Sequence, residues 1–322
     1  MNLQNAKISV VTPTFYRPLE TLELLKNLAL QKLLPAEIIL VDGAPPAEMT
    51  TEKIVREVSG NFPFEIRYFR KTGGTAIQRN YGIDATQGDF IALIDDDVRL
   101  DADFLFSIVE NFAKDEEKKI GGIVGFRREG HFTIESATRW KWYKRLGLLK
   151  TFEPGKYDYE CGYPINSYLQ PPFAGIRPVD FMTTACAVWR REVFAEGLRF
   201  HPFFRDYGVL EDAHFSLRAG RRWQLFQCGD ALCSELNSPN GRVERRRIGY
   251  NCVVNYYFVF QDIVRPLSAA HKFRFWRYQI FELFRIGMSA LRRRRRADLK
   301  EFCGRIEGFW AVLRGAGRSV NN

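Results

Sequence analysis

The stretch Ile91-Ala92-Leu93-Ile94-Asp95-Asp96-Asp97-Val98 joins an apolar run with strand character to three consecutive carboxylates. Three neighbouring anions repel one another, and they need a cation or hydrogen-bond donors to compensate them. At the carboxyl end of a strand in an open α/β sheet, such residues face the crevice where ligands bind. Asp95 and Asp97 lie two residues apart, and their hard oxygens suit Mg²⁺ or Mn²⁺. The alternative interpretation is a solvated turn, because Asp is common in turns.

The residues around this stretch alternate between strand and helix patterns. Strands are expected at residues 7–12, 37–41, 65–69 and 89–94, and helices at residues 19–30, 49–58, 75–86 and 102–112. The alternation predicts βαβ units, and therefore an α/β fold with a mainly parallel central sheet flanked by helices. Asp42 and Asp95 then both lie at carboxyl ends of strands, on the edge of the sheet that binds ligands.

Four motifs give the chain a resemblance to a known family. They are VVTPTFYR at residues 10–17, EIILVDG at 37–43, GTAIQRNYG at 74–82 running on to the acidic stretch, and YGVLEDAHFSLR at 207–218. In this order they resemble the family 2 glycosyltransferases of the GT-A fold, over roughly residues 5 to 230. The resemblance implies an enzyme that moves a sugar from a nucleotide diphosphate sugar to an acceptor hydroxyl.

The resemblance also implies roles for residues of the first half. Asp97 would hold a divalent metal, Mn²⁺ or Mg²⁺, and Asp95 would face the ribose or share the metal. Such a cation stabilises the charge that grows on a diphosphate leaving group. The nucleotide would be bound by Thr12, Pro13, Thr14, Arg17, Asp42, Arg79, Asp95 and Asp96. The alternatives are a surface arginine for Arg79 and a strand-ending turn for Asp42.

The acidic pair Glu211-Asp212 precedes a helical run that ends near Gly220. An attacking hydroxyl loses its proton, and a carboxylate within hydrogen-bond reach can accept it. By resemblance, Asp212 is the expected general base, which implies in-line displacement with inversion at the anomeric carbon. Glu211 would position the acceptor or support the helix end. Ordinary helix capping is the alternative interpretation of the pair.

A histidine that many relatives carry downstream of the acidic pair is absent here. Residues 229–242 contain no His, and Glu235 is the candidate for a third metal ligand, although it would add negative charge. The four histidines show no metal-binding spacing, and His214 is expected to be packed or at the surface. The stretch 181–189 has strand character, and by resemblance the donor or acceptor pocket is expected at Thr183, Thr184 and Ala185.

Length and composition limit the number of domains that the chain can form. Its 322 residues, 46% of them hydrophobic, allow one large domain or a domain with an appendage. We expect a glycosyltransferase domain at 1–249, with a nucleotide-binding half at 1–125 and an acceptor half at 126–249. Six cysteines without a Cys-x-x-Cys pair favour reduced thiols in the cytoplasm. No secretory signal is evident, and no apolar run is long enough to span a membrane.

Residues 250–322 are expected to form a basic, amphipathic helical appendage. They carry 14 Lys and Arg against 5 Asp and Glu, whereas the first 249 residues carry 34 against 33. One helix face would hold Phe273, Trp276, Ile280, Leu283, Phe284, Gly287 and Leu291, followed by Arg292 to Arg296. This pattern predicts attachment to an anionic surface at the inner face of the cell membrane. Packing of the apolar face on the protein is the main alternative, and nucleic acid is not an expected partner because no nucleic-acid fold motif is present.

The sequence therefore predicts an inverting, metal-dependent glycosyltransferase in polysaccharide or glycolipid assembly. Its partners would be a nucleotide diphosphate sugar, with UDP first and GDP or dTDP as alternatives, and a glycan or lipid-linked acceptor. One other function is a sugar nucleotidyltransferase, but residues 12–17 lack the glycines expected of its amino-terminal loop. Another is a non-catalytic nucleotide-sugar or glycan-binding protein, against which the retention of Asp95, Asp97 and Asp212 argues.

Overall fold

A computed structural model describes residues 6–129, 134–205, 208–236 and 244–317, except the side chains of residues 134–138. The chain divides into two compact units. The sheet unit comprises residues 1–131, 167–206 and 211–241, and the helical unit comprises residues 132–166, 207–210 and 242–322. This division groups residues 132–166 with the carboxyl-terminal helices, and the domain boundary expected after residue 249 stays a prediction.

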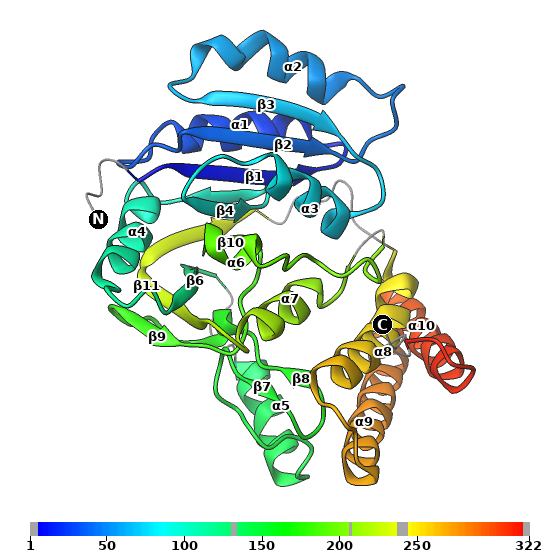
Figure 1. The fold of residues 1–322 in the computed structure, drawn as a ribbon. Helices are drawn as coiled ribbons and strands as arrows, with labels where there is room; N and C mark the ends of the chain where they lie inside the picture. The colour runs from blue at the N-terminus through cyan, green and yellow to red at the C-terminus, as the bar shows by residue number, and fades with distance from the viewer. Residues whose placement is uncertain (1–5, 130–133, 206–207, 237–243, 318–322) are drawn as a thin grey trace. The chain divides into compact units, whose positions relative to one another are not determined.

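The sheet unit is built on a nine-stranded sheet with the order β3-β2-β1-β4-β10-β6-β11-β5, in which β9 also pairs with β11 (Figure 1). The strands are β1 (Ile8–Thr14), β2 (Glu37–Asp42), β3 (Glu65–Arg70), β4 (Phe90–Ile94), β5 (Val98–Leu100), β6 (Ile120–Arg127), β9 (Ile176–Pro178), β10 (Cys186–Arg190) and β11 (Gln224–Glu235). Strands β3, β2, β1 and β4 are parallel, and β10 lies antiparallel between β4 and β6. The predicted α/β fold with a mainly parallel sheet is confirmed.

Helices flank this sheet, as the alternating pattern predicted. They are α1 (Pro18–Leu28), α2 (Thr50–Val58), α3 (Thr75–Ala85), α4 (Phe104–Lys114), α6 (Arg191–Ala195) and α7 (Glu211–Ala219), with short 3₁₀ turns at Ser59–Asn61 and Ser167–Leu169. Every residue of β1, β2 and β4 is buried. Parallel strands covered on both faces need such continuous apolar runs, which explains why the sequence located them.

The carboxyl ends of the parallel strands bring the expected site residues to one edge. Thr14 lies opposite Asp42 in the β1–β2 register, and β4 ends directly before Asp95. Gln78 on α3 ties these ends together, because its amide donates to the carbonyls of Thr14 at 3.0 Å and Val41 at 2.7 Å. A Cβ at Gly82 would lie 2.4 Å from a Val11 methyl, so glycine permits this close approach of α3 to the sheet.

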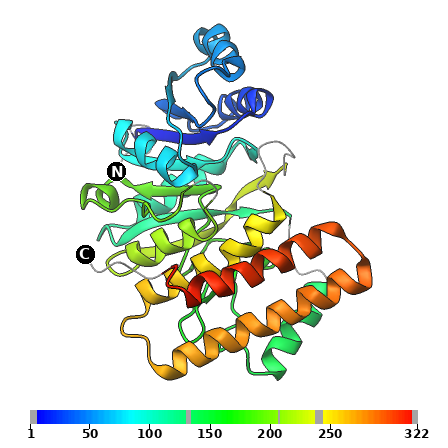
Figure 2. The same ribbon diagram turned by 90° about the vertical axis from the view of Figure 1, so that its right-hand side faces the viewer.

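The described residues of the helical unit form four helices and a short hairpin. They are α5 (Ile134–Arg145), β7 (Tyr157–Asp158), β8 (Tyr163–Pro164), α8 (Arg245–Ile263), α9 (Ala269–Arg293) and α10 (Arg296–Leu313). Helices α9 and α10 run antiparallel and are joined by a tight turn (Figure 2). Helices α8 and α10 are in close contact, since a Cβ at Gly304 would lie 1.9 Å from the Arg246 carbonyl oxygen.

The expected amphipathic helix forms as α9, and it has both a buried side and an exposed apolar side. The buried side holds Phe275, Tyr278, Gln279, Glu282 and Ile286. Four residues of the expected apolar face are exposed, namely Phe273 at 66%, Ile280 at 58%, Phe284 at 65% and Leu291 at 74%. Trp276 instead packs against the rings of Tyr257 and Phe309. Among the described helices, none combines the length and the apolar character that crossing a bilayer requires.

Candidate active site

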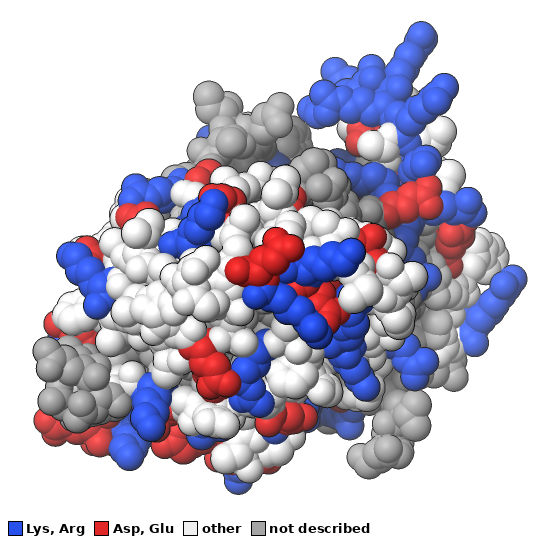
Figure 3. Space-filling model, turned by 90° about the horizontal axis from the view of Figure 1, so that it is seen from above, with Lys and Arg blue, Asp and Glu red and all other residues white. Residues whose placement is uncertain are grey.

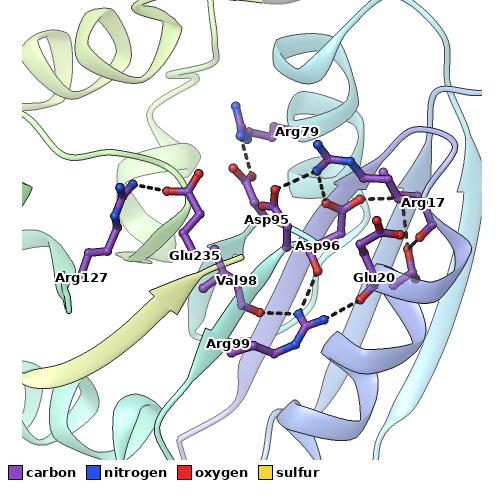
Figure 4. Close-up of polar contacts among 12 residues, drawn as sticks. Arg17, Glu20, Arg79, Asp95, Asp96, Val98, Arg99, Arg127 and Glu235 are labelled. Carbon is purple, nitrogen blue, oxygen red and sulfur yellow. Dashed lines mark hydrogen bonds and ion pairs between the residues drawn. The ribbon is translucent and has the colours of Figure 1, made fainter. Parts of the chain in front are cut away.

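The acidic turn after β4 is held by two arginines (Figure 4). Nη1 of Arg17 donates to Asp96 Oδ1 at 2.6 Å and to Asp97 Oδ2 at 3.2 Å. Nη2 of Arg79 donates to Asp95 Oδ1 at 2.8 Å. The side chain of Asp95 is 32% exposed, against 3% for Asp96 and 10% for Asp97. Asp95 is therefore the carboxylate of the turn that is most open to a ligand.

Asp96 is the buried member of the turn, and both of its oxygens are engaged. Thr14 Oγ1 donates to Asp96 Oδ2 at 2.8 Å, while Arg17 contacts the other oxygen. Burial raises the pKa of Asp96 to about 7, although the charge of Arg17 opposes this shift. These contacts join the end of β1 to the acidic turn. They suit a positioning role, and the expected nucleotide contact of Asp96 stays a prediction.

Asp42 ends β2 and is fully buried. Its Oδ1 accepts from the Ala44 amide at 2.7 Å, and its Oδ2 accepts from the Tyr68 hydroxyl at 2.5 Å. Sequence reasoning missed Tyr68, although the parallel register of β2 and β3 places it opposite Leu40, two residues before Asp42. The Thr12 hydroxyl nearby on β1 is buried without a hydrogen-bond partner among the described residues. The expected nucleotide contact of Thr12 stays a prediction.

Arg79 joins carboxylates from distant parts of the chain. It lies on α3, which begins after two glycines with positive φ, Gly73 and Gly74. Besides Asp95, it contacts Glu211, with Nη1 at 3.1 Å from Glu211 Oε1. Arg79 is 3% exposed, so the surface interpretation is wrong. The sequence did not reveal its pairing with Glu211, because nothing in either segment specifies the tertiary contact.

The acidic pair begins α7 and has two different environments. Glu211 is buried and accepts from Arg79 and from Thr75 Oγ1 at 3.3 Å. Asp212 is half-buried and accepts from the Ala213 amide at 2.7 Å. Burial raises the pKa of both carboxyls, and the charge of Asp212 raises that of Glu211 further. The Ala213 contact is local helix-end bonding, and it leaves Asp212 able to accept a proton.

Glu235, the candidate third metal ligand, is paired with a cation. It ends β11, where it forms an ion pair with Arg127 (Figure 4). The Arg127 guanidinium also lies 4.9 Å from the Tyr168 ring centre. The following amide, of Leu236, donates to the Asp97 carbonyl at 2.9 Å. Within the described ranges, no three His, Cys, Asp or Glu side chains form a metal-binding group. The role of Glu235 as a ligand stays a prediction.

Asp95 and Asp97 still fit a divalent cation that is shared with a substrate. Such ions are commonly held by one or two carboxylates together with substrate phosphates, rather than by an all-protein cage. The two aspartates supply hard oxygens at a strand end, and the neighbouring arginines compensate their charge in the structure. The donor set therefore suits a metal that arrives with a diphosphate.

The loop before β10 lies against the acidic turn. The Ala185 carbonyl accepts from the Asp95 amide at 3.2 Å, and Cys186 lies opposite Ile94 in the antiparallel register. Thr184 is buried, whereas Thr183 and Ala185 are half-buried. Of the expected pocket residues, Ala185 therefore contacts Asp95 through its backbone carbonyl. His214 is fully buried and packs against the rings of His201 and Phe204, as expected of a packed residue.

Residues 9–198 match the model of Glycosyl transferase family 2, which is more than half of the chain. The chain belongs to this family. A stretch of 91 residues is 34% identical to an uncharacterized glycosyltransferase, YwdF, of Bacillus subtilis (strain 168), and covers 28% of this chain and 32% of that protein. A stretch of 90 residues is 31% identical to a glycosyltransferase of Haemophilus influenzae, covering 28% and 29%. The chain thus spans under a third of the length of these curated relatives.

Solved structures share the fold of this glycosyltransferase. The mannosyltransferase PcManGT from Pyrobaculum calidifontis, in complex with GDP-Man and Mn²⁺, has a TM-score of 0.57 and 16% identity, over 95% of this chain and 87% of that one. GalNAc-T7, solved with UDP, GalNAc and Mn²⁺, has a TM-score of 0.58 and 15% identity, over 97% and 58%. These likenesses confirm the predicted GT-A-like fold.

Proposed function

We propose that this family 2 glycosyltransferase moves a sugar from a nucleotide diphosphate sugar to an acceptor hydroxyl with inversion, and that Asp212 is the general base. The observation that carries the proposal is the environment of Asp212. Asp212 is half-buried, and burial raises its pKa. Asp212 also follows Glu211 directly in the chain, and Arg79 contacts both Glu211 and Asp95. A carboxylate with a raised pKa accepts a proton more readily near neutral pH.

The nucleotide would bind at the carboxyl edge of β1, β2 and β4. The proposed contacts are Thr12, Pro13, Thr14, Arg17, Asp42, Arg79, Asp95 and Asp96, together with the loop residues Thr183, Thr184 and Ala185 for the sugar. The β1–β2 register supports a shared site at this edge, because it places Thr14 opposite Asp42. The solved neighbours hold GDP-Man or UDP. UDP is the first candidate for this chain, with GDP and dTDP as alternatives.

A divalent cation would be held by Asp97 and Asp95, and Mn²⁺ is favoured because both neighbours were solved with it. When bound, it would supply Lewis-acid stabilisation of the diphosphate leaving group. Arg17 and Arg79 form ion pairs with the carboxylates of this turn. Guanidinium groups also bind phosphate oxygens well, so both arginines suit contacts to the leaving group.

The acceptor would donate its proton to Asp212 as its oxygen attacks the anomeric carbon. Glu211 is anchored by Arg79 and Thr75, and it would orient the acceptor rather than take the proton. The sugar–phosphate bond breaks as the new glycosidic bond forms, and the nucleotide diphosphate leaves with the bonding electrons. A single base on the face opposite the leaving group inverts the anomeric configuration.

The acceptor would be a growing glycan or a lipid-linked glycan at a membrane, in polysaccharide or glycolipid assembly. The exposed apolar residues of α9, beside the arginine run at 292–296, support attachment to an anionic membrane surface. Attachment would concentrate the enzyme where such acceptors occur.

The proposal is tested with the purified chain, Mn²⁺, and UDP-, GDP- and dTDP-sugars. We expect one nucleotide sugar to be consumed faster in the presence of Mn²⁺, with slow hydrolysis to water when no acceptor is supplied. Nuclear magnetic resonance of the first-formed sugar would show inverted configuration. Retained configuration would contradict the assignment of Asp212, and the absence of turnover with every nucleotide sugar would count against transferase activity.

A further inference from the structure

A pocket of about 500 Å³ lies at the turn between α9 and α10, within the helical unit. Its walls are partly apolar and partly cationic, and its lining residues are Gly287, Ala290, Leu291, Arg294, Arg295, Arg296, Leu299 and Phe302. Its volume falls within the range of about 300–1,000 Å³ that is typical of small-molecule sites. Gly287 allows α9 to approach Phe302 of α10 closely at this wall, because a Cβ there would lie 3.0 Å from the Phe302 ring.

The three arginines of the pocket have no carboxylate partner within the described part of the chain. Arg294 is in the left-handed region at the end of α9, Arg295 is the N-cap residue of α10, and Arg296 is the first residue of α10. Cations are unfavourable at a helix amino terminus, where the backbone amides already present positive charge. Figure 3 shows Lys and Arg side chains gathered in one dense group, whereas elsewhere on that face blue and red side chains are interspersed.

Because the pocket has both cationic and apolar walls, a complementary ligand would carry an anionic group and an apolar chain. A phosphate group would satisfy the arginines, and guanidinium groups bind phosphate with charge-assisted hydrogen bonds. An alkyl chain would cover Leu291, Leu299 and Phe302, of which Leu291 and Leu299 are 74% and 55% exposed. A free phosphate would leave the apolar wall wet, and a neutral alkyl chain would leave the arginines uncompensated.

We propose that this pocket binds one anionic lipid molecule, with its phosphate on Arg294, Arg295 and Arg296 and its alkyl chain along Leu291, Leu299 and Phe302. The proposal concerns a defined single-lipid site. It is independent of the transfer reaction, and it goes beyond the attachment to a charged membrane surface proposed above, which needs no bound lipid.

The test uses dodecyl phosphate below its micelle concentration and the full chain, measured by calorimetry. We expect saturable binding of one molecule per chain, at least about tenfold tighter than binding of inorganic phosphate or of dodecyl maltoside, because each of these lacks one half of the interaction. Inorganic phosphate bound as tightly as dodecyl phosphate would overturn the proposal, as would the absence of saturable binding.

Matched variants distinguish a specific binding site from general electrostatic attraction of the anion to the protein surface. Replacing Arg294, Arg295 and Arg296 with Gln should weaken dodecyl phosphate binding by about tenfold or more. The control replaces Lys141, Lys144 and Arg145 with Gln, since these exposed α5 residues carry the same charge in the same unit. Equal losses in both variants would overturn the proposal. Circular dichroism would verify folding of both.

The apolar wall has its own pair of variants. Leu299→Ser should weaken dodecyl phosphate binding about three- to tenfold and leave inorganic phosphate binding unchanged. Leu313→Ser is the control, because Leu313 is 64% exposed near the other end of α10 and does not line the pocket. An unchanged affinity in Leu299→Ser would also overturn the assignment of the alkyl chain to this wall.

Discussion

Two buried glutamates, one in each unit, have pKa values that are shifted in opposite directions. Glu282 on α9 accepts from Arg285 at 2.9 and 3.0 Å, from Arg139 at 3.2 Å and from the Tyr143 hydroxyl. Burial alone would raise its pKa, but these donors outweigh burial and hold the pKa at about 2. Burial raises the pKa of Glu211, and the charge of Asp212 raises it further, while the one arginine that opposes the shift, Arg79, is shared with Asp95.

The difference lies in the number of donors for each carboxylate. Glu282 has two arginines and a hydroxyl, so its charge is fully compensated and it stabilises the fold of the helical unit. At the sheet edge, Arg79 serves two carboxylates while Asp212 has no arginine in direct contact within the described residues. A site that is short of donors is poised to receive a proton or a cation. The predictions below test this distinction.

The largest expected effect is on transfer. Asp212→Asn keeps the shape of the side chain and removes its ability to accept a proton, so the transfer rate should fall by about 10²- to 10⁴-fold. Nucleotide binding, measured by calorimetry with Mn²⁺, should stay nearly unchanged. Asp84→Asn is the control, because Asp84 is exposed on α3 and pairs with Arg199. Activity of Asp212→Asn within a few-fold of the wild type would return Asp212 to helix capping.

The same substitution in the helical unit should act on stability. Glu282→Gln leaves Arg139 and Arg285 without a buried counter-charge, and the free energy of unfolding should fall by about 3–5 kcal/mol. Glu307→Gln, which breaks the exposed pair with Arg246, should have no measurable effect. Denaturant unfolding of the wild type, Glu282→Gln and Glu307→Gln measures the change in the free energy of unfolding for each variant. A similar stability of Glu282→Gln and the wild type would contradict the structural role.

The two glutamates should also give opposite slopes of stability against pH. Because the pKa of Glu282 is lowered from about 4.5 to about 2, its contribution is complete above pH 4.5 and is lost as the pH falls toward 2. Because the pKa of Glu211 is raised, the folded state retains a proton that the unfolded chain loses, so its contribution falls as the pH rises above about 4.5.

Unfolding curves of the single variants at several pH values separate these contributions. Glu282→Gln should flatten the acid side of the stability profile, and Glu211→Gln should flatten the decline on the neutral side. If stability depends on pH in the same way in Glu211→Gln and in the wild type, the pKa of Glu211 is not raised. The two glutamates would then not differ in the way proposed.

Metal and nucleotide binding should show a smaller effect. Asp97→Ala should weaken binding of the nucleotide diphosphate by about tenfold in the presence of Mn²⁺, and leave metal-free binding little changed. Calorimetry with UDP, GDP and dTDP, each with and without Mn²⁺, would measure this difference. Asp84→Ala is again the control. If Asp97→Ala and the wild type bind equally with Mn²⁺, Asp97 is not a ligand.

The sequence predicted the sheet edge well and the interior of the helical unit poorly. Continuous apolar runs mark the buried parallel strands, and Asp42 and Asp95 follow directly where such runs end. The contact of Arg79 with Glu211 depends on how α3 and α7 pack, which no local pattern specifies. In α9, Gln279 and Glu282 occupy the buried side, whereas Phe284 is exposed. Hydrophobic patterning does not predict that Gln279 and Glu282 are buried, because tertiary partners such as Tyr143 compensate Glu282.

The smallest expected effect concerns a single charge on α9. It distinguishes an exposed arginine from one that is paired with a buried carboxylate. Arg292 is exposed in the last turn of α9 and does not line the pocket, whereas Arg285 is paired with Glu282. Arg292→Gln should weaken binding to vesicles of anionic lipid by about 1 kcal/mol, or about fivefold, and the difference should shrink as added salt screens exposed charges. Arg285→Gln should lower stability, since its partner is buried.

The reporter for this last measurement should sit on the exposed side of the helix. Trp276 is a poor choice because aromatic rings already surround it. In a Phe284→Trp variant, the new indole replaces a side chain that is 65% exposed, so its fluorescence should shift to the blue when it enters a lipid interface. Subtracting the spectrum of the unsubstituted protein under the same conditions isolates the shift. If the new indole does not respond to anionic vesicles while Arg292→Gln still weakens binding, the arginines attract the surface but the apolar residues of α9 do not enter it.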